Sequence, residues 1–352
     1  MISGDGKMNN KKRSKSPHSI LPAVFMAAAI TLSGSYSNAG EASIEQLVAE
    51  MNRRIEAITM AEKENGLVPR FNQPKTVGCV SAEFRVHGDI AKELKQGFFS
   101  RPATYPAMLR FANATNRDDS KKDIRGVSIK VSNVTGPVLW GEPGAQDFVF
   151  NSYPALFVAT PEEFLAFIRA RQEDKKLLFF LNPFDLHLKS LWIGFMARKK
   201  HLSPLDIRYF STVPFRLGET GDQVVKYSLS PCSNYKTTEA VNAGKNQLRY
   251  AIKAHLKQEP ACFHFGVQLQ TDPESMPIED ASVIWDEKAS PFRTVATITI
   301  ENQEFDTQEA LAACERSSFN PWQSLAAHEP LGRMNEVRRL VYAHAAKVRN
   351  KE

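Results

Sequence analysis

Apolar and polar residues alternate through much of the chain, and this pattern predicts β-strands. In the segment 80–86 every second residue is apolar and the residues between them are Ser, Glu and Arg, as expected of a strand with one buried face. Comparable short runs follow near residues 106–113, 125–132, 146–151, 207–215, 223–230, 262–270 and 293–301. The chain therefore carries two sets of four predicted strands, with a helical region between the two sets.

Other segments have the apolar spacing of helices. Residues 42–64 place Ile, Leu, Val and Met side chains on one helical face, and the segments 161–171, 307–316 and 335–349 are also predicted helices. Eight strands are enough to close a barrel whose interior holds side chains or one small ligand. Because the chain shows no internal repeat and no low-complexity linker, we predict one α+β domain. Its expected architecture is an eight-stranded antiparallel β-barrel with helical insertions and C-terminal helices.

The segment 177–200 is rich in Leu, Phe and Trp. Asn182, Pro183, Asp185, His187 and Lys189 interrupt it, so it is a poor candidate for a membrane span. We expect a helical excursion buried by ordinary core packing. The alternative interpretation is a role in admitting an apolar substrate.

The first residues have the pattern of a secretory signal. Five Lys and Arg residues between positions 7 and 15 precede an uncharged apolar run from Ile20 to Leu32, and Ser37-Asn38-Ala39 stands before Gly40. An apolar run of this length is too short for a comfortable transmembrane anchor. We therefore expect residues 1–39 to be removed as a signal peptide, leaving a functional domain at 40–352 in the periplasm.

Composition and charge narrow the class of protein. With 42% apolar and 24% charged residues the chain is globular. Without residues 1–39 it has 40 basic and 38 acidic residues, a net charge of +2, which is too small an excess to indicate a nucleic-acid partner. The four cysteines, Cys79, Cys232, Cys262 and Cys314, form no metal-binding spacing. We expect buried thiols or one structural disulfide, with the pairing left open.

The predicted C-terminal helix carries candidate chemistry. Arg338 and Tyr342 are four residues apart and share one helical face, and Arg349 follows two turns later. A guanidinium against a phenol oxygen stabilises its anion, and a phenolate is a suitable ligand for haem iron. Arg349 could pair with a haem propionate. Because Arg and Tyr at this spacing also occur by chance on surface helices, the motif alone is weak.

Further segments resemble the catalase superfamily. Arg338 to Tyr342, with Arg349, resembles its proximal haem motif. The segment 147–154 resembles the one that carries the distal Asn, here Asn151, followed by channel aromatics that we assign to cofactor binding, here Phe157 and Phe164. The segments 108–111 and 123–126 resemble the arginine-bearing barrel strands, which include Arg110. Arg70 to Lys75 resembles the segment with a propionate-binding Arg, here Arg70, and the distal His three residues later.

The resemblance covers residues 65–350 and implies a barrel of the catalase type. It implies haem b bound through Tyr342, with Arg338 keeping the ligand anionic and Arg70, Arg110 and Arg349 at the propionates. The segments 318–322, 328–332 and 271–280 are most similar to small bacterial catalase-like proteins related to the allene oxide synthase domain of coral. Catalases are often tetramers with extended arms. Since this chain lacks long arms, we expect a monomer or, if it forms a homo-oligomer, a dimer.

One departure from the pattern affects the expected chemistry. The distal His position falls on Gln73, which can form hydrogen bonds but cannot take up a proton near neutral pH. Loss of a general base typically costs about 10²–10⁴ in rate. Ala112 also stands where the resemblance predicts a Ser. Two histidines are considered as replacements for the missing base. His87 is expected at the end of a strand far from Gln73, and His264 lies in another predicted strand.

Three hypotheses follow from these residues. The first is a haem-dependent oxidoreductase that acts on hydrogen peroxide or on organic, lipid-derived hydroperoxides, with weakened catalase activity because of Gln73. The second is a non-enzymatic haem-binding protein or sensor, which Gln73 and Ala112 favour. The third, a catalase fold without haem, is disfavoured by the presence of Arg338, Tyr342 and Arg349.

Overall fold

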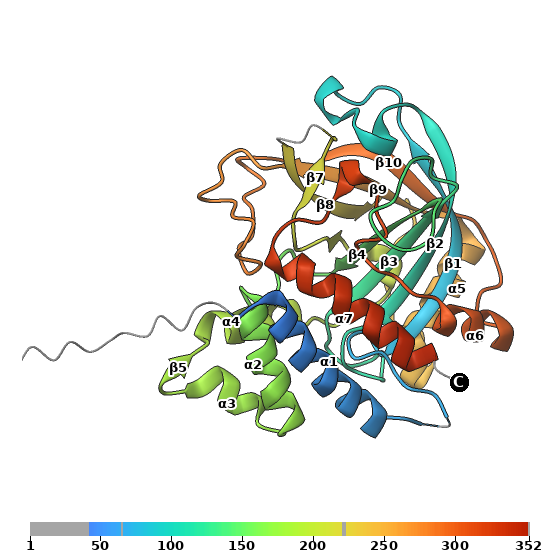
Figure 1. Ribbon diagram of the computed structural model, residues 1–352. Coiled ribbons are helices and arrows are strands. Elements are labelled where there is room, and N and C mark those ends of the chain that lie inside the picture. The colour runs from blue at the N-terminus through green and yellow to red at the C-terminus, as the bar shows by residue number, and fades with distance from the viewer. Residues whose placement is uncertain (1–41, 65, 220–222, 351–352) are drawn as a thin grey trace, which may run out of the picture. The chain divides into compact units, whose positions relative to one another are not determined.

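The computed structural model describes residues 42–64, 66–219 and 223–350, which fold as one compact unit (Figure 1). The predicted signal peptide, residues 1–39, lies outside the described residues. The α-helices are α1 Ile44–Ala61, α2 Pro161–Gln172, α3 Lys176–Leu181, α4 Leu188–Ala197, α5 Gln247–Gln258, α6 Gln308–Arg316 and α7 Arg333–Asn350. The 3-10 helices are η1 Lys92–Leu94, η2 Gly97–Phe99, η3 Pro204–Asp206, η4 Gly244–Asn246 and η5 Ala326–His328. The strands are β1 Lys75–Val86, β2 Ala103–Asn113, β3 Arg125–Ser132, β4 Ala145–Asn151, β5 Asp185–Leu186, β6 Tyr209–Phe210, β7 Phe215–Leu217, β8 Gln223–Pro231, β9 Ala261–Leu269 and β10 Arg293–Ile300.

Eight antiparallel strands close into a barrel. Their order is β6-β4-β3-β2-β1-β10-β9-β8, and the pairing of β6 with β8 closes the ring. The short strand β7 pairs with the first residues of β8, on the edge opposite β9 that β6 also contacts. Full closure leaves these eight strands without an open edge. The predicted eight-stranded antiparallel barrel within an α+β fold is therefore confirmed.

Two details of the predicted elements are wrong. The expected strand 207–215 consists of β6 and the start of β7, because Thr212 between them adopts a left-handed conformation (φ +64°) that a continuous strand does not allow. Helix α5 was not predicted. Its buried Leu248, Ala251, Ile252 and Leu256 nevertheless have helical spacing.

Aromatic side chains fill the core of the barrel. Phe148 packs against Phe265 and Tyr227 with ring centroids 4.9 and 5.3 Å apart, and all three side chains are fully buried. Because successive residues of a strand point to opposite faces, Asn151 at the end of β4 faces away from the side that Phe148 and Phe150 occupy. A functional site that includes Asn151 therefore lies outside the packed interior.

A second, smaller core lies where α1, α2 and α7 pack together. Leu47, Met51 and Ile55 of α1 belong to one hydrophobic cluster with Ile168 of α2 and Val341 of α7. Phe71, which precedes β1, belongs to the same cluster. This packing brings the segment before β1 alongside the C-terminal helix (Figure 1).

The expectation that residues 177–200 are buried is wrong. In α3, β5 and α4 the large apolar side chains are mostly exposed, and Phe184 is 96% accessible to solvent. Phe179, Ile193 and Ala197 are the apolar residues here that point inward. The periodicity of the sequence could not reveal this, because the segment is apolar on both of its faces. No helix within the described residues is long and apolar enough to cross a membrane.

The four cysteines form two disulfides rather than one or none. Cys79 of β1 is bonded to Cys314 of α6, and Cys232 is bonded to Cys262 of β9. The Cys79–Cys314 bond connects residues 235 positions apart in the chain and attaches α6 to the barrel. The end of α6 thereby has a fixed position beside β1.

Candidate functional site

Gln73 lies in a turn whose backbone is held at several points. Its φ of +57° is in the left-handed region, which is uncommon for residues other than glycine. Its N–H donates to the carbonyl of Ala114 at 3.2 Å, and its carbonyl accepts from Nη2 of Arg110 at 2.9 Å. Strained conformations of this kind persist where the surroundings hold them, and they cluster at functional sites.

The side chain of Gln73 lies on the barrel wall beside Asn151. Asn151 of β4 pairs with Gly126 of β3, and the Gln73 amide covers Gly126 so closely that a Cβ there would be 1.9 Å from the amide nitrogen. The amide donates to Oδ1 of Asn151 at 3.1 Å. The two residues assigned to catalysis from the sequence are therefore direct neighbours, and Gly126 provides the space that Gln73 occupies.

Ala112 is the next residue along the same row of the sheet. It pairs with Gly126 across β2 and β3 and with Thr76 across β1 and β2. Thr76 accepts a hydrogen bond from Nε of Arg110. Ala112 and Gly126 are thus small neighbours in this row, and the Gln73 amide lies over Gly126.

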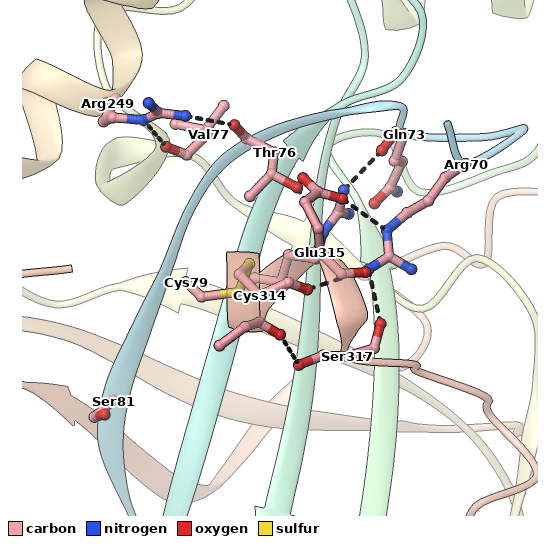
Figure 2. Close-up of a disulfide and its surroundings, with 12 residues drawn as sticks. Arg70, Gln73, Thr76, Val77, Cys79, Ser81, Arg249, Cys314, Glu315 and Ser317 are labelled. Atoms are coloured by element: carbon pink, nitrogen blue, oxygen red, sulfur yellow. Dashed lines mark hydrogen bonds and ion pairs between the residues drawn. A yellow bond between two sulfur atoms is a disulfide. The ribbon is translucent and has the colours of Figure 1, made fainter. Parts of the chain in front are cut away.

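Arg70 and Arg349 meet at the end of α6, although they are almost 280 residues apart. Both donate to the carbonyl oxygen of Ser317, at 2.7 Å from Arg70 and 3.0 Å from Arg349. Arg70 also donates to the carbonyls of Cys314 and Glu315. Figure 2 shows Arg70 reaching across to this segment beside the Cys79–Cys314 disulfide.

Arg110, which is buried, completes a group of three cations with the partly buried Arg70 and Arg349, and one carboxylate, that of Glu315, lies near them. Burial lowers the pKa of Arg110 to about 10 and lowers the pKa of Arg70 and Arg349. The charges of Arg110 and Arg349 lower the pKa of Arg70 further, and Glu315 opposes the shift in all three. The Nε atoms of Arg70 and Arg349 are buried and donate no hydrogen bond. Nε of Arg70 is paired with the Glu315 carboxylate only at 3.9 Å, so an anion bound here would relieve the repulsion and supply hydrogen-bond acceptors to both Nε atoms.

Glu315 and Ser317 were not predicted as site residues. Their sequence positions carry no local signal, because their role comes from the Cys79–Cys314 bond and from arginines far away in the chain. Arg125, by contrast, points elsewhere. Its guanidinium donates to the carbonyls of Asp119 and Lys121, which stabilises the loop between β2 and β3.

Tyr342 is held by Arg338 one turn earlier in α7. Nη2 and Nε of Arg338 lie 3.3 and 3.4 Å from the phenol oxygen, so the guanidinium donates to the atom that would ligate iron. Nη1 of Arg338 donates to Oδ1 of Asn335 at 3.0 Å. This positions the guanidinium between the two side chains.

Asn335 is a positioning residue that the sequence analysis missed. It is fully buried, and its amide donates to the carbonyls of Pro214 and Leu331. The indole N–H of Trp322 donates to the backbone carbonyl of Asn335. The sequence could have indicated this role, because Asn335 stands three residues before Arg338 and residues i and i+3 share a helical face.

Phe157 and Phe164 are near each other at the start of an aromatic series. Their ring centroids are 6.5 Å apart, and Phe157 packs edge-on against Phe167 at 4.7 Å. Phe164 contacts both hydrophobic cores. The two residues assigned to the channel therefore lie where the barrel core and the helix cluster meet.

Neither histidine considered as a substitute lies near Gln73. His87 follows the end of β1 opposite to Gln73, and its Nε2 is 2.8 Å from the hydroxyl of Thr297. His264 pairs with Thr297 across β9 and β10. Among the residues that the structure describes, no other side chain is found in a position to act as a general base in place of the distal histidine.

The donor set fits a haem group. Tyr342 would be the iron ligand, and its phenol oxygen already receives two contacts from one guanidinium. Arg70, Arg110 and Arg349 would bind the propionates, and two of them have buried Nε–H groups without an acceptor. Gln73 and Asn151 form the polar pair on the barrel wall that could bind a small polar substrate.

Comparisons with known proteins agree with this description. The catalase family model matches residues 37–182. The fold is that of a fungal catalase (18% identity, TM-score 0.64, 84% of this chain and 62% of that chain). Catalase A from Saccharomyces cerevisiae has the same fold (17% identity, TM-score 0.65, 84% of this chain and 63% of that chain). A bacterial catalase does as well (16% identity, TM-score 0.63, 92% of this chain and 64% of that chain). The chain covers less than two-thirds of the length of each, and no curated protein sequence matches it significantly. The resemblance to the catalase superfamily is confirmed, and the relation to coral allene oxide synthase stays a prediction.

Proposed function

We propose that this chain, with a catalase fold and a match to the catalase family model, is a haem-dependent oxidoreductase that acts on peroxides. One observation carries the proposal. Arg338 donates to the phenol oxygen of Tyr342, while Arg70, Arg110 and Arg349 form an under-neutralised group of cations. An iron ligand and a propionate site are thus formed by the same chain.

The proposed cofactor is haem b, which supplies redox-active iron when it is bound. Arg338 donates to the phenol oxygen of Tyr342, so a positively charged donor stands beside the atom that would ligate the iron. Asn335 keeps Arg338 in place for this task. Arg70, Arg110 and Arg349 bind the two carboxylates and determine the orientation of the group.

Gln73 and Asn151 would bind the peroxide by hydrogen bonds. Asn151 orients the substrate, and Gln73 offers one donor and one acceptor group but no proton uptake. A catalytic His would take a proton from one oxygen of the peroxide and return it to the other. We infer that this chain dismutates hydrogen peroxide slowly and that an organic hydroperoxide, in particular one derived from a lipid, is the better substrate.

The second candidate is a non-enzymatic haem-binding or sensor protein. The hydrogen bond between Gln73 and Asn151 favours it, since the amide nitrogen of Gln73 and Oδ1 of Asn151 are already engaged with each other. In both cases we propose that the protein works in the periplasm after loss of residues 1–39.

A spectroscopic experiment separates the two candidates. The purified protein is examined for a Soret band and then mixed rapidly with hydrogen peroxide or with an organic hydroperoxide. Rapid spectral change with consumption of the organic hydroperoxide supports the enzyme. A Soret band that neither peroxide changes, with no peroxide consumed, supports the binding protein. A preparation grown with ample iron that has no Soret band contradicts both.

A further inference from the structure

The excursion formed by α3, β5 and α4 exposes a continuous set of large apolar side chains. In α4 the exposed Leu188, Leu191, Trp192 and Phe195 are spaced as one face of a helix. Ile193 and Ala197 on the other face are buried. The helix is therefore apolar both toward the protein and toward solvent.

The turn between α3 and α4 continues this surface. Phe184 is 96% exposed, and Leu181 and Leu186 on either side of it are exposed as well. In Figure 1 this turn, marked by β5, lies beyond α2 on the side away from the barrel strands. Exposed apolar patches of this kind mark sites of interaction, because each large side chain left in water is costly. We name the set Leu177, Leu178, Leu181, Phe184, Leu186, Leu188, Leu191, Trp192 and Phe195 the apolar tip.

Positive charges flank the apolar tip. Between residues 173 and 200 there are six Lys and Arg residues and three acidic residues, Glu173, Asp174 and Asp185. Three of the cations form ion pairs, Lys175 with Glu173, Lys189 with Asp280 and Arg198 with Asp123. Lys176 is the first residue of α3, Lys175 precedes it, and Lys199 and Lys200 follow α4; all four are exposed. The charge is local, because the chain from residue 40 onward has a net charge of only +2.

We propose that the apolar tip inserts into the surface of an anionic phospholipid bilayer. Trp, Phe and Leu side chains flanked by Lys and Arg are the composition of segments that lie in a membrane interface, with basic residues at the lipid headgroups. A second copy of the chain is the less favourable partner. A symmetric contact between two such tips would bring their basic flanks together.

A series of aromatic contacts leads to the apolar tip, and it indicates how membrane docking would serve the protein. Phe167 of α2 contacts Phe157 at 4.7 Å and Phe179 of α3 at 5.5 Å. Phe179 and Phe180 in turn lie 5.0 Å apart at the base of the tip. An aromatic series therefore runs from Phe157, which the catalase resemblance assigns to the cofactor, to the base of the tip. An apolar substrate released from a bilayer would meet the protein at this end.

Vesicle co-sedimentation tests the proposal without peroxide, so its result does not depend on the proposed enzymatic function. Vesicles of phosphatidylglycerol and phosphatidylcholine (1:3) are compared with vesicles of phosphatidylcholine alone. We expect binding to the anionic vesicles that is at least tenfold stronger, with a blue shift of Trp192 fluorescence. Absence of binding to the anionic vesicles overturns the proposal.

Two sets of variants locate the contact. The triple variant Phe184→Ser, Trp192→Ser, Phe195→Ser should lose at least tenfold in vesicle binding. The control Met60→Ser, Leu67→Ser, Tyr250→Ser, which removes three exposed apolar residues elsewhere, should bind as the unmodified protein does. Lys176→Glu with Lys200→Glu should weaken binding to anionic vesicles only, whereas Lys257→Glu with Lys347→Glu should not.

The oligomeric state serves as the opposing readout. Light scattering of each variant reports its mass in solution. If the unmodified protein is a dimer that fails to bind vesicles, and the triple variant is a monomer, then the tip is an interface between copies and the proposal is wrong. Equal vesicle binding by the triple variant and its control also contradicts it.

Discussion

The side-chain amide of Gln73 donates a hydrogen bond to Oδ1 of Asn151, 3.1 Å away, from a backbone in the left-handed conformation. The contact places a residue without acid–base capacity at the position where the catalase resemblance requires a histidine. The carbonyl of the same residue is held by Arg110, one of the three arginines at the proposed propionate site. The proposed substrate and cofactor sites are thus connected through Gln73.

Replacing Gln73 by His should raise the rate with hydrogen peroxide about 100-fold, because a general base typically contributes 10²–10⁴. His is among the residues that tolerate a left-handed φ, so the turn should keep its conformation. Stopped-flow measurement of peroxide consumption tests this. Gln73→Asn, which tolerates the same φ but offers no base, is the control and should show no gain. An equal lack of gain in Gln73→His with an intact Soret band would contradict the placement of the distal site.

Tyr342→Phe should abolish or strongly reduce haem retention, since it removes the oxygen that Arg338 contacts. The ratio of Soret to protein absorbance measures the bound haem. Tyr250→Phe, at an exposed tyrosine of α5, is the matched control and should retain haem fully. A Tyr342→Phe variant with normal haem content and an unaltered spectrum would rule out the assigned ligand.

Arg349→Met should weaken haem binding about tenfold, a change of about 1.4 kcal/mol. It should leave the stability of the haem-free protein within about 1 kcal/mol, because Arg349 is a partly buried cation close to two others. Haem titration and urea unfolding measure the two effects. Arg316→Met, which changes an exposed arginine at the end of α6, should alter neither. If Arg349→Met lost stability but kept haem affinity, the arginine group would be purely structural.

The two disulfides should differ in their effect on the site. Replacing Cys79 and Cys314 by Ala frees the end of α6, where Ser317 accepts from Arg70 and Arg349, so both stability and haem affinity should fall. Replacing Cys232 and Cys262 should lower stability alone, by about 2–4 kcal/mol. Haem titration of the two double variants makes the comparison, and equal affinities would refute the assigned role of α6.

Stability should decline in acid partly through His328. This buried residue accepts from the backbone N–H of Phe98 and contacts the Tyr227 hydroxyl, and burial lowers its pKa to about 3. In the unfolded chain a histidine has a pKa near 6.5. Below that pH the unfolded chain therefore binds a proton that the folded chain does not bind, which favours unfolding. The contribution of His328 is complete above pH 6.5 and is lost as the pH falls toward 3.

His328→Gln tests this pH dependence, because Gln keeps hydrogen-bonding capacity without the titration. Between pH 7.5 and pH 5 the unmodified protein should lose about 2 kcal/mol more than the variant, at about 1.4 kcal/mol per pH unit below 6.5. Urea unfolding at the two pH values measures the difference. Identical losses in the two proteins would show that His328 titrates normally in the folded state.

The sequence alone determined the barrel and the proximal motif. Alternation in segments such as 80–86 reports which face of a strand is buried, and the spacing of Arg338 and Tyr342 brings them together on any helix. Both signals are local, so they are present before the chain folds. The resemblance to catalases, which rests on the order of such segments, was recognisable for the same reason.

Only the tertiary structure decided the rest. It paired Cys79 with Cys314, brought Arg70 and Arg349 to the carbonyl of Ser317, and left the apolar segment 177–200 exposed. Each of these depends on contacts between residues far apart in the chain, and periodicity along the sequence carries no information about the partner that a face will meet. An apolar face is buried only if another surface covers it, and for α3 and α4 no described part of this chain supplies that cover.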